Sequence, residues 1–149
     1  KRRDYTRIEN GRNPIVAHEF LGTSVDGKDV IIIDDMISSG ESIIETAEAL
    51  KARKANRIFV FSTFGLFTNG LEKFDKAYES GLITRILTTN LIYQTEELLS
   101  REWYINCDMS KYIAYIIDTL NHDSSISDLL NPVEKIQSVV TRYKNNETI

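Results

Sequence analysis

Short apolar runs alternate with helix-forming segments along most of this chain, and this alternation restricts the fold more than any other feature. The first run is Val30–Ile33, four β-branched residues with no polar residue among them. Such a strand is expected to be buried on both faces, as in a parallel sheet. Further runs follow at residues 57–61, 85–88 and 103–105. The alternation predicts right-handed βαβ units, so we expect an α/β fold: a parallel sheet flanked by helices on both faces.

The helices are predicted from spacing and capping residues. Ser42–Glu45 reads Ser-x-x-Glu, which is a capping-box sequence, and apolar residues then recur at helical spacing. Further helices are expected over residues 71–80 and 96–101, from Ser110 onward, and from Asn131 to residue 144. In the helix from Ser110 we expect an inward face made of Ile113, Ile116, Ile117 and Leu120. Before all of these, residues 15–21 alternate loosely and predict an antiparallel or edge strand.

Length and composition exclude several classes of protein. A chain of 149 residues with 42% hydrophobic content suits one globular domain with its own core. Its one cysteine, Cys107, excludes a disulfide framework and a cysteine-rich zinc site. No apolar run approaches the roughly 20 residues that cross a bilayer. With no visible signal peptide either, we expect a cytoplasmic protein with no membrane partner. The first residue is Lys1 rather than Met, so we also expect a segment upstream of it.

The charge is unevenly distributed. The net charge is −4, yet the first twelve residues contain five basic and two acidic side chains, a local +3. The remaining residues must therefore carry −7. This balance disfavours a nucleic-acid partner, which needs a broad basic surface. A small anionic ligand close to the basic arm remains compatible with it.

The segment Asp34–Ser42 follows the first apolar run directly and precedes a predicted helix. Ligands of parallel sheets bind at the carboxyl ends of the strands, so this segment is the candidate site. Asp34 and Asp35 are adjacent carboxylates, which can accept hydrogen bonds from the vicinal hydroxyls of a sugar or help to hold Mg²⁺. The run that follows, Ser38–Ser42, brings hydroxyls and a glycine to a helix N-terminus, where phosphate binds. Together these groups match the two ends of a ribose 5-phosphate.

A simpler interpretation is that this segment is an ordinary loop. Asp, Ser and Gly are common loop residues, and Ser42 alone could be a helix cap. Its context favours a site: an apolar strand, two adjacent acids, a small polar run and a capping sequence follow one another without interruption. We therefore favour a phosphate or sugar-phosphate site.

Several motifs resemble those of a known family. Val30–Ile43 resembles the phosphoribosyl-binding motif of type I phosphoribosyltransferases. Lys1–Arg3 resembles the Lys-Arg-Arg of the catalytic flexible loop in ribose-phosphate pyrophosphokinases. Other segments similar to that family occur in the family's order, at Gly27–Asp29, Ser62–Phe67, Leu87–Asn90 and Ile126–Leu130. The resemblance covers about residues 1–130 and suggests the C-terminal half of such an enzyme.

The resemblance implies a reaction and a role for each site residue. The family transfers the diphosphoryl group of ATP to the 1-hydroxyl of ribose 5-phosphate, giving phosphoribosyl diphosphate and AMP, with Mg²⁺ as cofactor. Lys1 and Arg3 would be catalytic and would neutralise the transferring phosphates. Asp34 and Asp35 would hold the ribose hydroxyls, partly through Mg²⁺. The 5-phosphate would be bound by Ser38, Ser39, Gly40, Glu41 and Ser42.

The same resemblance implies an organisation in three parts. Residues 1–14 would be the basic arm, residues 15–130 the phosphoribosyltransferase-like domain, and residues 131–149 a helical extension. Because only the second of the family's two similar halves is matched, we expect the isolated chain to be inactive. By analogy with the family we also expect a homo-oligomer.

Two departures from the family pattern leave other functions open. The loop has Ser38–Ser42 where the family commonly has Asp-Thr-Gly/Ala-Gly-Thr, so Glu41 places a carboxylate beside the expected phosphate. Phe64 replaces a usual histidine. The alternatives are a nucleobase phosphoribosyltransferase, which would also need a segment that recognises a base, and a catalytically weak regulatory subunit associated with a synthetase.

Overall fold

A computed structural model describes residues 2–3, 6–8, 15–17 and 22–147 of the chain. The chain forms two compact units, Lys1–Cys107 and Asp108–Ile149, and each is described by itself. Among the described residues, no helix has the length and apolar character needed to cross a membrane.

The first unit is built on a parallel sheet of four strands. In chain order the strands are β3 (Val30–Ile37), β4 (Ile58–Gly65), β5 (Arg85–Thr89) and β6 (Tyr104–Cys107). They lie in that same order across the sheet, and all neighbours are parallel. The connecting helices are α1 (Glu41–Lys51), α2 (Glu72–Glu79) and α3 (Glu96–Leu99). The predicted α/β fold with a parallel sheet and flanking helices is confirmed, and the carboxyl ends of the strands share one edge. The expected covering of both faces is not found for the described residues, because Ile31 and Ile33 of β3 are exposed on one face.

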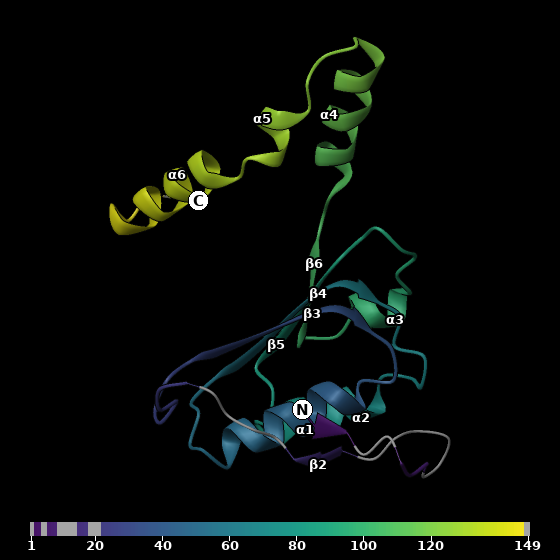
Figure 1. The fold of residues 1–149 in the computed structure, drawn as a ribbon, viewed down its shortest axis with the longest axis vertical. Helices are drawn as coiled ribbons and strands as arrows, with labels where there is room; N and C mark the ends of the chain where they lie inside the picture. Colours follow the sequence, from purple (N-terminus) through teal and green to yellow (C-terminus); the bar gives the residue numbers. More distant parts are fainter. Residues whose placement is uncertain (1, 4–5, 9–14, 18–21, 148–149) are drawn as a thin grey trace. The chain divides into compact units, whose positions relative to one another are not determined.

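The core of the first unit lies between the sheet and helices α1 and α2, which run together along one face of the sheet (Figure 1). Its buried residues include Ile58, Val60 and Ile86 from the strands, Ile43 and Ala47 from α1, and Phe74 and Ala77 from α2. Burying each large aliphatic or aromatic side chain stabilises the fold by about 1.5–3 kcal/mol. This layer therefore holds the helices against the sheet, and with them the segment that joins β3 to α1.

The other face of the sheet carries exposed apolar side chains. Ile31 is 59% exposed and Ile33 is 82% exposed, whereas Ile32 between them is half-buried. The strand register aligns Ile33 with Phe61, Leu87 and Ile105 in one row across the sheet. The prediction that Val30–Ile33 is buried on both faces is therefore wrong for these described residues. The reason is that α1 and α2 both cover the same face, which an unbroken apolar run does not reveal.

Strand β3, which leads into the candidate site, is longer than the sequence predicts. β3 runs to Ile37, because Met36 and Ile37 continue the parallel register with β4. The helix begins two residues earlier than the capping-box pattern predicts, at Glu41, and Gly40 precedes it without a side-chain cap. The predicted Ser42–Glu45 capping box is therefore wrong: Ser42 lies inside the helix, and one carboxylate oxygen of Glu45 is buried without a hydrogen-bond partner.

A small antiparallel pair precedes the main sheet. Its strands are β1 (Arg2–Arg3) and β2 (Ile15–Ala17). The expected antiparallel strand is thus confirmed for residues 15–17, while residues 18–21 of the same prediction lie outside the described part of the chain.

The second unit is helical, with α4 (Ser110–Asn121), α5 (Ser127–Leu130) and α6 (Val133–Lys144). The Tyr112 hydroxyl donates to the Leu129 carbonyl at 2.7 Å and joins α4 to α5. Asn131 accepts from the backbone N–H of Val133, as a residue at the start of a helix should. The expected inward face of α4 is wrong in the described structure, because no residue of α4 is buried. Helical spacing locates an apolar face but not the surface that covers it.

Candidate functional site

The candidate site centres on a three-residue connection, Ser38–Gly40, between the end of β3 and the start of α1. It lies at the edge of the sheet where the carboxyl ends of the strands meet. Ser39 and Gly40 are buried, whereas Ser38 is exposed. Gly40 has a φ of 76°, in the left-handed region that favours glycine. We call residues Ser38–Ser42 the serine loop.

The segment after β4 supports the serine loop from the side. The backbone N–H groups of Leu66 and Phe67 donate to the Ile37 carbonyl, at 2.8 and 3.2 Å. The N–H of Thr68 donates to the Ser38 carbonyl at 3.1 Å, and the two hydroxyls of Ser38 and Thr68 lie 3.4 Å apart. The loop is therefore held by backbone hydrogen bonds from the segment after β4, which the sequence of the loop does not predict.

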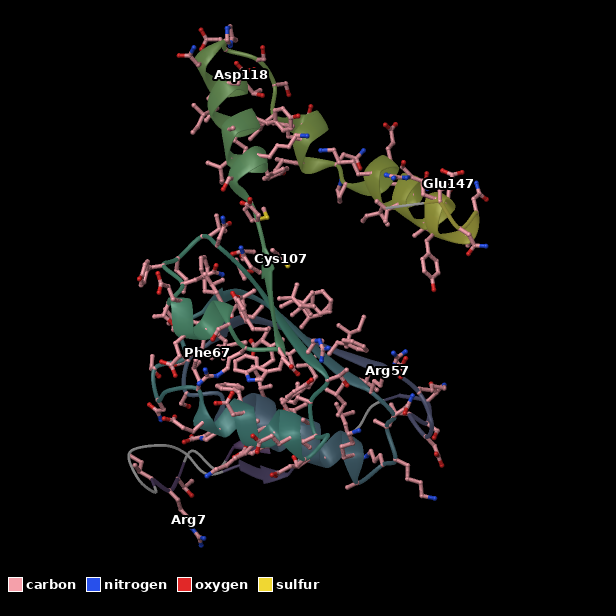
Figure 2. All side chains as sticks on the ribbon, turned by 180° about the vertical axis from the view of Figure 1, so that it is seen from behind. Arg7, Arg57, Phe67, Cys107, Asp118 and Glu147 are labelled. Atoms are coloured by element: carbon pink, nitrogen blue, oxygen red, sulfur yellow. The ribbon has the colours of Figure 1, made fainter. Side chains whose placement is uncertain are left out.

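Phe74 of α2 packs directly against Gly40. A Cβ atom placed on Gly40 would lie 2.1 Å from the Phe74 ring, which is far closer than any real contact. The ring belongs to an aromatic cluster: its centroid is 5.0 Å from that of Phe67, edge to face, and 5.7 Å from that of Trp103. Figure 2 shows Phe67 in the side-chain layer between the sheet and the helices. A glycine at this position is what allows α2 to begin against the loop.

Glu41, the first residue of α1, has a partner on α2. Its Oε1 atom lies 3.6 Å from Nζ of Lys73, and both side chains are partly exposed, at 44% and 38%. The carboxylate that departs from the family pattern is therefore accompanied by a cation. Sequence reasoning did not identify Lys73, and no spacing rule connects it to Glu41; only the packing of α2 does.

Asp34 and Asp35 lie within β3 rather than in a loop. Successive side chains of a strand point to opposite faces, so Asp34 shares the half-buried face of Ile32 and Asp35 the exposed face of Ile33. Oδ1 of Asp34 accepts a hydrogen bond from the Asp35 backbone N–H at 3.0 Å. The structure thus brings both carboxylates to the edge that holds the serine loop, with different surroundings for each.

Two predicted catalytic residues cannot be placed at the site. Lys1 lies outside the described residues, and Arg3 is described only as part of the backbone of β1.

The neighbouring strands carry buried polar side chains near the same edge. Thr88 is 1% exposed, and its hydroxyl lies 2.7 Å from that of Tyr104. Gln94 donates to the Thr89 carbonyl at 3.1 Å and also to Tyr104. Burial raises the pKa of the Tyr104 phenol, so this hydroxyl stays protonated at neutral pH. These groups satisfy one another and join the start of β6 to the carboxyl end of β5.

A metal ion would find few protein ligands here. Among the described residues, no group of three or more histidine, cysteine or acidic side chains comes together. Mg²⁺ is commonly held by one or two carboxylates together with substrate phosphates. Asp34 and Asp35 fit that pattern and do not fit an all-protein cage.

The fold and the serine loop define an α/β protein with its candidate ligand site at the carboxyl ends of parallel strands. Residues 12–131 match the model of the family described as phosphoribosyl synthetase-associated domain. Since the match covers most of the chain, the chain belongs to this family.

Curated relatives agree with this assignment. The chain is 30% identical over 107 residues to the ribose-phosphate pyrophosphokinase of Vibrio cholerae, covering 72% of this chain and 33% of the relative. It is 31% identical over 107 residues to that of Shewanella oneidensis, with the same coverage. The chain thus spans about one third of the length of these relatives. The resemblance to ribose-phosphate pyrophosphokinases, a family of transferases, is confirmed.

A solved structure shares the fold. The phosphoribosylpyrophosphate synthetase from Mycobacterium smegmatis superposes with a TM-score of 0.60 at 21% identity. The superposition covers 78% of this chain and 36% of that one.

Proposed function

We propose that this chain is the part of a ribose-phosphate pyrophosphokinase that binds ribose 5-phosphate. The observation that carries the proposal is the junction of β3 and α1, where two carboxylates and a buttressed serine loop meet at the carboxyl edge of a parallel sheet. A helix N-terminus presents N–H groups and the positive end of the helix dipole to a phosphate. Membership of the phosphoribosyl synthetase-associated family supports the same ligand class.

Each group of the site has a proposed role. The serine loop binds the 5-phosphate, and Asp34 and Asp35 accept hydrogen bonds from the ribose hydroxyls. These carboxylates, together with substrate oxygens, would hold Mg²⁺, which would supply charge neutralisation. Lys1 and Arg3 stay proposed catalytic residues of a basic arm, residues 1–14, that precedes the domain at 15–130 and the extension at 131–149.

The proposed reaction of the whole protein is diphosphoryl transfer from ATP to the 1-hydroxyl of ribose 5-phosphate. Such a transfer depends on positioning and on neutralisation of phosphate charge. Because the chain spans about one third of its relatives, we expect it to form no AMP by itself. A cytoplasmic homo-oligomer is proposed on the same analogy.

Calorimetric titration of the chain with ribose 5-phosphate, with and without Mg²⁺, tests this function. We expect binding of ribose 5-phosphate, weaker binding of inorganic phosphate and no binding of ribose. Asp35→Asn should weaken ribose 5-phosphate about tenfold, because a hydrogen bond to a charged group is lost. Asp123→Asn removes the same charge from the second unit and should change nothing. Absence of binding at millimolar ribose 5-phosphate under both conditions would overturn the proposal.

A second candidate is a non-catalytic subunit associated with a synthetase. Two observations favour it: the family's description as a synthetase-associated domain, and the carboxylate of Glu41 at the serine loop. In that case ribose 5-phosphate would bind, but a parent protein containing this chain would not form AMP. Loss of the parent's activity on Lys1→Ala substitution would instead support the catalytic role.

A further inference from the structure

The ion pair between Glu41 and Lys73 lies at the N-terminus of α1, the end of the helix to which the proposed function assigns the phosphate. Glu41 is the first residue of α1, so its carboxylate stands beside the helix N-terminus. A carboxylate there competes with an anionic ligand for the same positive end of the helix dipole. The Lys73 ammonium, 3.6 Å away, offsets that charge.

The packing of the neighbouring residue Phe74 places Lys73 beside the serine loop. The ion pair with Glu41 is not needed for this placement. Phe74 is 1% exposed and is seated against Gly40. Phe74 also packs within the cluster of Phe67 and Trp103. The start of α2 is therefore fixed at the serine loop independently of any attraction between Glu41 and Lys73.

We propose that Lys73 is a phosphate-binding residue of the serine loop and that Glu41 is its internal competitor. This inference rests on the proposed function, because it concerns the same phosphate. When a phosphate dianion binds, the Lys73 ammonium exchanges the carboxylate of Glu41 for the oxygens of the phosphate. Both side chains are partly exposed, so the exchange needs only rotation of two flexible side chains on either side of a fixed backbone.

The exchange has consequences that a simple surface ion pair lacks. Removing the competitor should tighten phosphate binding, because Lys73 is then available and a repelling charge is gone. Removing Lys73 should weaken binding, because the contact between its ammonium and the phosphate is lost. The effect of losing Lys73 should also be larger once Glu41 is already neutral, since no ion pair has to be broken in that background.

A double-mutant cycle on the full chain tests these statements, with ribose 5-phosphate as the probe and calorimetry as the measurement. Glu41→Gln should tighten binding about three- to fivefold and Lys73→Met should weaken it by a similar factor, as expected for partly exposed charges. In the Glu41→Gln background, Lys73→Met should cause a larger loss than in the unsubstituted chain. Both effects should shrink as salt rises.

Matched controls remove the same charges elsewhere on the same helices. Lys76→Met takes a lysine from the exposed surface of α2, and Glu48→Gln takes a carboxylate from the exposed surface of α1. Neither should change affinity by more than the general charge effect. Thermal unfolding of every variant shows whether the fold is retained.

The outcomes separate this inference from the proposed function. If the unsubstituted chain binds no ribose 5-phosphate, both are overturned. If it binds, but Glu41→Gln and Lys73→Met match their controls, the role of Lys73 is overturned while the proposed function stands. Equal loss from Lys73→Met in both backgrounds would also overturn the exchange.

Discussion

Gly40 is the residue on which the geometry of the serine loop depends. Its φ of 76° favours glycine, and the ring of Phe74 occupies the space that a side chain would need. The two demands are separate, because one concerns the backbone and the other the packing of α2. Together they explain why a small residue lies between two serines and Glu41 at this point of the chain.

Gly40→Ala should therefore destabilise the fold by more than the cost of the backbone alone. We expect a loss of about 2–4 kcal/mol in the free energy of unfolding, from the left-handed conformation and from overpacking against Phe74. Gly27→Ala is the matched control: its φ is 68°, but nothing lies within 4 Å of the added Cβ. It should lose only about 1 kcal/mol. Urea unfolding checks both, and equal losses would contradict the packing argument.

Asp29 makes a pH-dependent contribution at the opposite end of the sheet. Hydrogen bonds from the Arg57 side chain hold the pKa of Asp29 below its usual value, and Arg57 Nε donates to the carboxylate at 3.1 Å. Because the pKa in the folded state is lower than in the unfolded chain, this contribution is present above about pH 4 and is lost as pH falls through the folded pKa.

Asp29→Asn should thus lower stability at pH 7 and lower it less at pH 3. The measurement is the difference in free energy of unfolding between the variant and the unsubstituted chain across that range. Asp26→Asn is the control, since its carboxylate and its partner Lys54 are largely exposed and 4.0 Å apart. A difference for Asp29→Asn that does not change with pH would contradict the assignment.

At the scale of elements, one carboxylate joins α2 to the segment that enters β6. Asp75 accepts from Nε1 of Trp103 at 2.7 Å and from Nε of Arg101 at 3.0 Å. Trp103 is 2% exposed, so its N–H has no access to water as an alternative partner. Since Phe74 is the neighbouring residue, the same contact also steadies the start of α2 beside the serine loop.

Asp75→Ala should weaken the attachment of α2 to the segment that enters β6. Leaving the buried indole N–H of Trp103 without a partner costs about 1–3 kcal/mol. The emission of Trp103, the one tryptophan of the chain, should shift as its surroundings change. Glu97→Ala removes the other carboxylate near Arg101, at 2.9 Å, from a largely exposed position. It should cost much less, and equal effects of the two variants would argue against a special role for Asp75.

At the scale of the whole molecule, the buried core belongs to one unit. Every buried apolar residue of the described chain lies between Ile37 and Tyr104, and α4 and α6 contribute none. The serine loop and its supports lie within the same unit. Folding of the site should therefore not require residues 108–149.

A chain ending at Cys107 should keep cooperative thermal unfolding and the same response to ribose 5-phosphate. Scanning calorimetry with and without that ligand measures both, since a ligand that binds only the folded state raises the transition temperature. Loss of the cooperative transition would contradict an autonomous first unit. The exposed row of Ile33, Phe61 and Ile105 makes self-association a necessary control at several protein concentrations.

Much of the fold could be read from local pattern. β-branched runs, helical spacing and turn residues act over a few neighbouring positions, and they predicted the four parallel strands and the junction that carries Ser38–Ser42. The same local signals placed the end of β3 too early, because aspartate, as at Asp34 and Asp35, has a low strand propensity. Pairing with β4 keeps them extended, and pairing is a property of two segments.

By itself, therefore, the sequence determined the α/β class, the order of the elements, the position of the candidate site and the family resemblance. Only the tertiary structure decided which face of the sheet is open, that Phe74 lies against Gly40, and that Lys73 stands beside Glu41. The physical reason is one of range. Conformational preferences are fixed by neighbours along the chain, whereas contacts between two helices depend on how the whole core packs, which no local pattern records.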